Sequence, residues 1–400
     1  MTGNHTNQAS GTGAKSTDAP ASRGPLIRWY ISSATMGVPQ AAGPVAFSLV
    51  ALAVTGNTSG GAAMMLAMTL AQVIGAIPIA RLGQPFPLAT FLRLLIAVRT
   101  LALASVALLA AYEAPFPWLI ALAAVAGLVN GAASGYLRAI LNHLASTSRL
   151  PRALGIAATL NETTFVLAPV MASGLGTLSP AFGVLALAAL GALPAVLIPS
   201  TGSTHIDAVR GASGSLLNPS LLLWLMCAAA GGATVAAIEI GAVALALNFG
   251  YEPALAILFT VPLCLASVAG GIWVSVRNRM ATRKAVVVQL SVMAIGSALT
   301  AFNLSIATTV VGAILVGSVL APLATYYSLV LDTLAPPQRR AEVFALLRTA
   351  NAVGVIFASA LLTVASLSLA LIVVTGLIIV VTAIVGIAST RHQAPVRPRE

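Results

Sequence analysis

Charged side chains are scarce in this sequence. Only 7% of the 400 residues are Asp, Glu, Lys or Arg, whereas soluble globular domains carry roughly 25%. Hydrophobic residues make up 58%, and the mean hydropathy is +0.99. A water-soluble core cannot absorb so much apolar surface. The composition therefore excludes a soluble protein and indicates a chain whose solvent is lipid.

Cysteine and catalytic motifs are also scarce. The two cysteines, Cys227 and Cys264, lie inside apolar runs, which predicts packing rather than a disulfide or a metal site. We find no Walker motif, no cluster of metal-ligand residues and no Ser/His/Asp constellation, and the four histidines are scattered. The sequence therefore predicts that the chain is not an enzyme and needs no cofactor or metal.

Acidic residues are fewer than basic ones, nine against 20, which gives a net charge of +11. In a soluble protein this excess could indicate a nucleic-acid partner. Here the basic residues lie in short loops between hydrophobic runs, where they act as a topology signal. We therefore expect no nucleic acid among the partners.

Continuous apolar runs of about 20 residues dominate what remains. In lipid every backbone polar group must be satisfied internally, so only helices or closed barrels can span. The runs do not alternate in segments of about ten residues, which excludes a barrel. The predicted fold class is an all-α membrane protein with twelve transmembrane helices, near residues 28–54, 58–80, 87–111, 117–144, 153–177, 181–199, 219–246, 253–276, 284–303, 306–333, 341–365 and 367–388.

The positions of the charges support this number of helices. With a cytoplasmic start, the outer loops hold no Lys or Arg and carry only Glu113 and Glu252, while the inner loops and tails hold a series of basic residues. By the positive-inside rule, both termini of this multi-pass cell-membrane protein are expected in the cytoplasm. The inner basic residues include Lys15, Arg23, Arg28, Arg81, Arg149, Arg152, Arg210, Arg277, Arg279, Arg283, Lys284, Arg339, Arg340, Arg391, Arg397 and Arg399.

A polar, Gly/Ser-rich segment divides the chain almost in half. We predict a disordered tail at 1–26, a six-helix bundle at 27–199, a cytoplasmic linker at 200–218, a second six-helix bundle at 219–388 and a tail at 389–400. A weak internal repeat agrees with this division. At one fixed offset, Leu141, Leu144, Ala145, Arg149 and Asn161 align with Leu331, Leu334, Ala335, Arg339 and Asn351.

Local motifs then resemble one known family. The loop Ala80-Arg81-Leu82-Gly83-Gln84-Pro85 matches the Arg and Gly of an Asp-Arg-x-Gly-type motif, with Ala80 at the acidic position. Ala168-Pro169 is a loose form of a Gly-Pro antiporter motif. With two six-helix halves, the chain resembles the major facilitator superfamily. Arg138-Ala139 and Asn161-Glu162 further resemble poorly characterised actinobacterial members.

This resemblance implies a secondary active transporter that works by alternating access between two rocking bundles. A sparsely charged cavity and the loose antiporter motif favour proton-coupled efflux of a small amphipathic or hydrophobic molecule. The expected partners are this small-molecule substrate, protons and the lipid bilayer, and the protein is expected to be a monomer. Alternatives are an importer of a small metabolite and a non-transporting membrane protein, such as a lipid scramblase or sensor.

Ionisable residues inside spans are costly and therefore mark candidate sites. Glu162 lies roughly 14 Å into the fifth span, and Arg138 lies at a similar depth in the fourth. We predict that the two can pair, with Glu162 carrying the proton and Arg138 tuning it. Glu239, towards the outer end of the seventh span, is a third proton-coupling candidate. Arg348 is expected to reach the inner surface or to pair with an acid such as Asp332.

Polar and glycine positions complete the prediction. Gly37, Pro39, Gly43 and Pro44 interrupt the first span, and broken helices often line transporter sites. The glycine stripe Gly127, Gly131 and Gly135 predicts close helix packing. The candidates for the cavity wall are Gln40, Asn130, Tyr136, Asn161, Tyr326 and Tyr327. The gate candidates are Arg81, Gly83, Asp332, Arg339 and Arg340.

Overall fold

Helices account for the regular structure of the described chain. The computed structural model describes residues 23–56, 59–176, 178–199, 218–251 and 253–391. Twelve stretches within them are long and apolar enough to cross a membrane, which confirms the predicted fold class. The α-helices are α1 (Arg23–Met36), α2 (Val38–Thr55), α3 (Ser59–Leu82), α4 (Leu88–Ala111), α5 (Phe116–Leu144), α6 (Leu150–Gly176), α7 (Pro180–Leu197), α8 (Pro219–Asn248), α9 (Ile257–Arg277), α10 (Arg283–Phe302), α11 (Ile306–Leu334), α12 (Arg340–Val364) and α13 (Leu367–Arg391).

The first span is broken, as its glycines and prolines predict. α1 ends at Met36, Gly37 intervenes, and α2 starts at Val38 with Pro39 in its first turn, where a missing N–H leaves no bond unmade. Together α1 and α2 form one span, Gly24–Thr55. The break places Gln40 in the first turn of a new helix, and this position matters for the site.

The start of the eighth span differs from the sequence prediction. A 3₁₀ turn, η1 (Pro253–Ala256), precedes α9, so the α-helix begins later than residue 253. A second 3₁₀ turn, η2 (Pro337–Arg339), leads into α12. Short polar caps begin other helices: Asn218, Thr282 and Ser305 each accept a hydrogen bond from a backbone N–H of the first turn of α8, α10 and α11.

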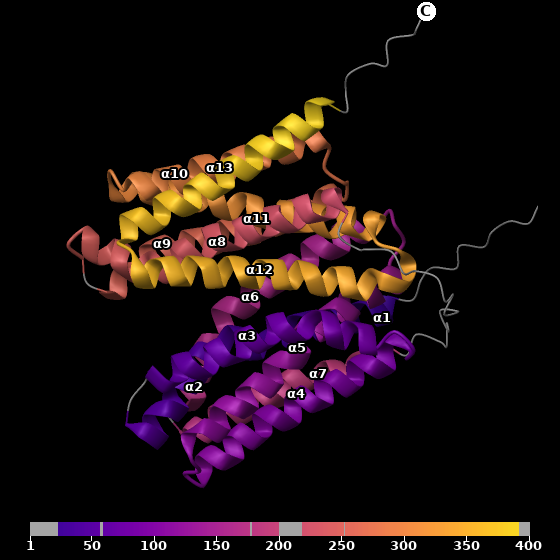
Figure 1. The fold of residues 1–400 in the computed structure, drawn as a ribbon, viewed down its shortest axis with the longest axis vertical. Helices are drawn as coiled ribbons and strands as arrows, with labels where there is room; N and C mark the ends of the chain where they lie inside the picture. The colour runs from indigo at the N-terminus through magenta and orange to yellow at the C-terminus, as the bar shows by residue number, and fades with distance from the viewer. Residues whose placement is uncertain (1–22, 57–58, 177, 200–217, 252, 392–400) are drawn as a thin grey trace, which may run out of the picture.

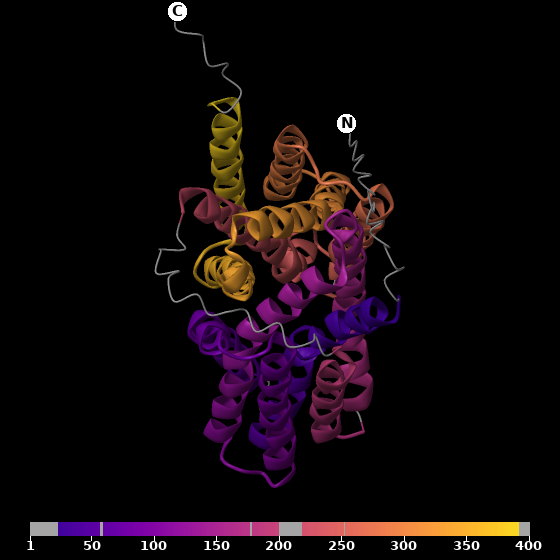
Figure 2. The same cartoon turned by 90° about the vertical axis from the view of Figure 1, so that its right-hand side faces the viewer.

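The spans form two six-helix bundles. α1–α7 pack mainly on one another, through pairs such as α3–α5, α4–α5 and α4–α7, and α8–α13 do so through α8–α12, α9–α11 and α10–α11. Figure 1 shows the first bundle in indigo to magenta and the second in orange to yellow, and Figure 2 shows the same division after a quarter turn. The principal pairs that join the bundles are α3–α12, α5–α12, α6–α9 and α6–α11.

Residues 190 positions apart meet across this junction. Arg138 bonds to Ser328 and Asn142 bonds to Asp332, and in both pairs the two residues are 190 apart in the sequence. This is the offset of the internal repeat. When two repeats are related by a two-fold axis, equivalent residues contact each other only beside that axis. The axis of the duplicated fold therefore runs between α5 and α11.

Parts of the predicted domain organisation lie outside the described residues. The linker at 200–218 lies outside the described residues except for its last position, Asn218, and so do most residues of the predicted tails 1–26 and 389–400.

Candidate functional site

An ion pair and several hydrogen bonds hold the two bundles together at one end of the molecule, which we call the basic end. It is formed by the loops 83–87, 145–149, 278–282 and 335–339 and the basic residues beside them. Here Glu342 of α12 is 2% exposed and lies between Arg81 of α3, 2.8 Å away, and Arg339, 2.9 Å away. Arg81 thus pairs with a carboxylate of the second bundle, because its neighbour Ala80 provides no carboxylate. A buried carboxylate needs such partners, because an unpaired charge is very costly there.

Asp332 forms a second link at this end. Its carboxylate pairs with Arg340, 3.3 Å away, and accepts a hydrogen bond from the Asn142 amide of the first bundle. Arg138 donates to Ser328 and to Asn142, and its guanidinium lies 4.5 Å from the centre of the Phe344 ring. The predicted gate residue Asp332 and the predicted coupling residue Arg138 therefore belong to one polar cluster between α5 and α11.

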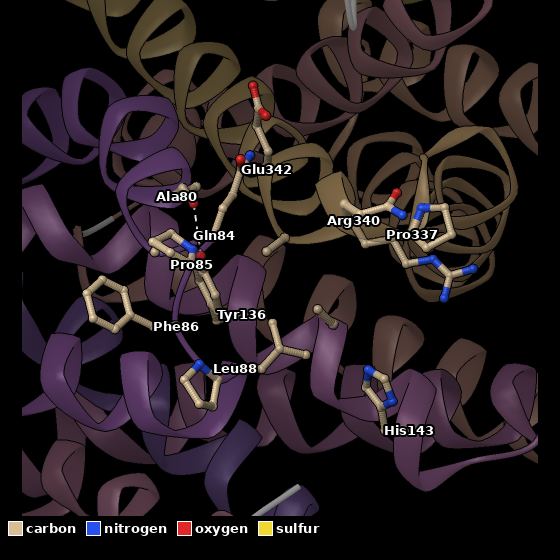
Figure 3. Close-up of a pocket in the computed structure, with 15 residues that line it drawn as sticks. Ala80, Gln84, Pro85, Phe86, Leu88, Tyr136, His143, Pro337, Arg340 and Glu342 are labelled. Carbon is tan, nitrogen blue, oxygen red and sulfur yellow. Dashed lines mark hydrogen bonds between the residues drawn. The ribbon is translucent and has the colours of Figure 1, made fainter. Parts of the chain in front are cut away.

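A pocket lies beside these pairs, between the loop after α3 and the start of α12. Figure 3 shows the Tyr136 hydroxyl donating to the Ala80 carbonyl, with Phe86 on one side and Arg340 and Pro337 on the other. Gly83 also lines it, and a Cβ at Gly83 would collide with Phe91 and with the Tyr136 hydroxyl. The loop therefore needs glycine at this position in order to pack against α5.

A further contact closes the basic end on its other side. The Asn278 side-chain NH₂ group donates to the Ser148 backbone carbonyl, and the Asn278 side-chain oxygen accepts from the Arg152 backbone N–H. Behind it α6 and α9 cross so closely that a Cβ on Gly155 would come within 2.7 Å of the Ser275 backbone nitrogen. None of the hydrogen bonds or ion pairs resolved between described residues joins the two bundles at the opposite end. The molecule is closed at its basic end.

Glu162 and Glu239 are acids on spans of different bundles. Glu162 is half-buried on α6, with Ser267 of α9 beside it. Glu239 is exposed on α8, and the two carboxyls lie within electrostatic range of each other, with Cys264 of α9 near both. No ion pair among the described residues involves either carboxyl. Two acids without an ion-pair partner among the described residues therefore lie within electrostatic range of each other, one in each bundle.

A polar network lies deeper in the first bundle. Arg99 of α4 is 3% exposed and donates to the carbonyls of Met36 and Gly191 and to the Asn130 side chain. Asn130 in turn donates to Gln40 and, in α3, to Gln72. From the second bundle, Arg348 of α12 also donates to Gln40, over 3.2 Å. The predicted cavity residues Gln40 and Asn130 are therefore joined to each other and to α12.

Several predicted placements need correction. Arg138 bonds to Ser328 and Asn142 and is not brought to Glu162. Arg348 bonds to Gln40 and not to Asp332.

Of the three tyrosines, Tyr136 borders the pocket at the basic end, whereas Tyr326 and Tyr327 are buried. Tyr136 is 1% exposed in the core beside the loop after α3, and Tyr326 and Tyr327 pack against Trp224 in the core of the second bundle. Asn161 is half-buried, and a Cβ on Gly37 at the helix break would lie 3.4 Å from its side-chain oxygen. Asn161 therefore lies beside the break in the first span.

Sequence reasoning missed Glu342 and left Arg99 out of the candidate site. Glu342 follows Arg339 by three positions, a spacing at which opposite charges meet on a helix, and this signal could have drawn attention to it. Arg99 lies near the middle of its span, where an arginine has no lipid-facing role and must find acceptors inside the bundle.

Comparison with known proteins places the chain among transporters. A protein-family model described as Major Facilitator Superfamily matches residues 30–359. A search of curated protein sequences finds no significant match.

Solved structures agree on the fold. One is a bacterial homologue of the iron transporter ferroportin in an outward-facing state, with a TM-score of 0.78 and 15% identity over 91% of this chain and 99% of that chain. The human organic anion transporter MFSD10 (TETRAN) has a TM-score of 0.72 and 14% identity, over 92% and 99%. The proton:xylose symporter XylE has a TM-score of 0.69 and 12% identity, over 90% and 94%. At these identities the likeness shows the fold alone.

Proposed function

The chain belongs to the Major Facilitator Superfamily, and from that premise we propose that it is a proton-coupled secondary transporter that exports a small amphipathic molecule from a bacterial cell. The positive-inside rule supports a cytoplasmic basic end, with both termini on that side. The closed basic end then corresponds to an outward-facing state. Alternating access opens this end by breaking the contacts of Glu342, Asp332 and Asn278.

The carboxyls of Glu162 and Glu239, which lie within electrostatic range of each other in different bundles, carry this proposal. In the outward-facing state both can exchange protons with water. When the outer end closes, α6 and α8 approach each other and water leaves, so two carboxylates would repel strongly in a medium of low dielectric constant. At least one proton must then stay with the pair. Proton uptake from outside therefore favours the inward-facing state, and proton release to the cytoplasm allows the return.

Export follows if the substrate binds after the protons have left on the cytoplasmic side. Substrate then travels outward as the deprotonated protein returns, and each cycle moves protons inward and substrate out. The amphipathic character of the substrate is supported by the composition of the pathway, since few charged residues lie within the spans and most of the bundle interior is apolar.

Inside-out membrane vesicles with a respiration-driven pH gradient test this function. We expect at least one compound from a panel of amphipathic molecules to dissipate the gradient in wild-type vesicles, and Glu162→Gln and Glu239→Gln to abolish the effect. Glu113→Gln, which alters an acid in the loop between α4 and α5, is the matched control and should behave as wild type. Unchanged gradient-driven transport in Glu162→Gln would overturn the proposal.

A further inference from the structure

Hydrogen-bond donors outnumber acceptors where α2 meets α12. Arg348 donates to Gln40 through one terminal nitrogen, and no hydrogen bond or ion pair between described residues uses its other N–H groups. Those groups are not among the buried polar atoms that lack a partner, so they face accessible space. Two buried groups of the same network also lack partners, Arg99 Nε and Gln72 Nε2.

The network also fixes the direction of each amide. Arginine can only donate, so the Asn130 atom that Arg99 contacts must be the side-chain oxygen, and the Asn130 nitrogen must point the other way. That nitrogen requires an oxygen from Gln40, and Arg348 requires the same oxygen. The Gln40 carbonyl is thus held by two donors, and its NH₂ group is left without a partner among the described residues. This NH₂ group and the free N–H groups of Arg348 are therefore hydrogen-bond donors without acceptors, and we call them together the donor wall.

No acid among the described residues neutralises the donor wall. Glu342 and Asp332 are paired at the basic end with Arg81, Arg339 and Arg340. Glu113 lies in the loop between α4 and α5, and no ion pair between described residues joins Glu162 or Glu239 to Arg348. Two guanidinium groups, Arg99 and Arg348, therefore lie inside the spans without a carboxylate, an arrangement that membranes strongly disfavour.

We propose that Arg348 and Gln40 bind an anionic group of the transported molecule. This inference rests on the proposed transport function and adds a substrate class: an amphipathic anion whose headgroup is a carboxylate or a phosphate. The planar guanidinium suits either headgroup, because its N–H groups can bind two oxygens side by side. Arg99 does not touch the anion. It is a positioning residue that orients Gln40 through Asn130.

The location suits alternating access. Arg348 lies eight residues after Arg340, roughly 12 Å along α12, and its partner Gln40 lies in the first turn of α2, directly after the helix break. Arg348 belongs to the second bundle and Gln40 to the first. An anion held by both therefore contacts the two bundles at once, as a substrate must if its binding is to influence their relative movement.

Thermal unfolding of the purified full-length protein tests the inference with four probes that share one tail: 3-phenylpropanoate, 3-phenylpropyl phosphate, 3-phenylpropanamide and 3-phenylpropylammonium. A ligand that binds the folded state raises the unfolding temperature. We expect the carboxylate, the phosphate or both to stabilise wild type more than the neutral amide does, and the ammonium not to stabilise it. Which anion is preferred identifies the headgroup.

Substitutions then assign the effect to its residues. Arg348→Gln should weaken binding of the preferred anion on the order of tenfold or more, and Arg348→Lys should restore part of it. Arg93→Gln is the matched control, because Arg93 is another half-buried arginine but bonds to the Ile198 carbonyl. The stability of Arg348→Lys without probe shows whether the site tolerates substitution.

Three results would overturn the inference: no anion preference in wild type, the same preference in Arg348→Gln, or selective stabilisation by the ammonium. Glu162→Gln separates the two proposals, because it should abolish proton coupling while the anion preference remains. Coupling without anion preference refutes this inference alone, and anion preference without coupling refutes the proposed coupling alone.

Discussion

Glu342 shows how one residue can couple two bundles. Its carboxylate is almost fully buried and forms ion pairs with Arg81 of the first bundle and with Arg339 of the second bundle. The family motif in the loop after α3 has an acidic position, which here is Ala80. The charge balance of this loop is therefore completed from α12, so the closed state depends on a residue of the other bundle.

Glu342→Gln should open the basic end. The substitution leaves Arg81 and Arg339 without a carboxylate, and breaking a buried pair in this way costs about 3–5 kcal/mol. A cysteine at Ala345, which is fully buried between α12 and α5, reports opening through its rate of alkylation by a water-soluble maleimide. In a background with Cys227 and Cys264 replaced by alanine, Glu342→Gln should raise this rate several-fold.

The control for this measurement is Glu113→Gln in the same background, which should leave the rate unchanged. Arg81→Gln removes one of the two pairs and should give an intermediate rate. Equal alkylation rates in wild type and in Glu342→Gln would show that the ion pairs do not hold the basic end closed.

Arg99 should be important for stability rather than for closure. Replacing it with methionine removes three hydrogen bonds and leaves the Met36 carbonyl and the Asn130 side-chain oxygen without a donor. Each orphaned acceptor costs about 1–3 kcal/mol. Arg99→Met should therefore lower the thermal unfolding temperature clearly, and Arg99→Lys should lower it less. An unfolding temperature equal to that of wild type would contradict the role assigned to this network.

At the scale of elements, the glycines of α5 serve two different contacts. A Cβ on Gly127 would collide with the Met68 backbone of α3, and one on Gly131 would come within 2.9 Å of Ala76. A Cβ on Gly135 would instead collide with the Ala341 carbonyl of α12, in the other bundle. The predicted close packing is confirmed, and the stripe divides into a part within the first bundle and a part at the junction.

Matched alanine substitutions should separate these roles. Gly127→Ala should destabilise the folded protein by about 1–3 kcal/mol through overpacking, seen as a lower unfolding temperature. Gly135→Ala should leave stability nearer to wild type but expose the cysteine at position 345, because the basic end cannot close fully. Gly376→Ala adds a Cβ to open space and should change neither property. The same outcome for Gly127→Ala and Gly135→Ala would contradict the division.

At the scale of the molecule, hydropathy and charge were sufficient to predict twelve spans, because a lipid solvent dictates both their length and the sign of their loops. The faces of the helices were harder to predict. Both the lipid and the bundle interior are apolar, so the sequence around Tyr326 and Tyr327 cannot say which face turns inward. Partners 190 residues apart, such as Arg138 and Ser328, are equally hidden until the bundles are placed together.

The distance between the outer ends of the bundles at different pH tests the central claim most directly. Spin labels at Ala53 on α2 and Leu247 on α8, in the cysteine-replaced background, report this distance by pulsed electron paramagnetic resonance. The account predicts a shift to shorter distances from alkaline to mildly acidic pH in wild type, and short distances at both pH values in Glu162→Gln/Glu239→Gln. A wild-type distance that does not change with pH, or a double variant that still responds, would contradict it.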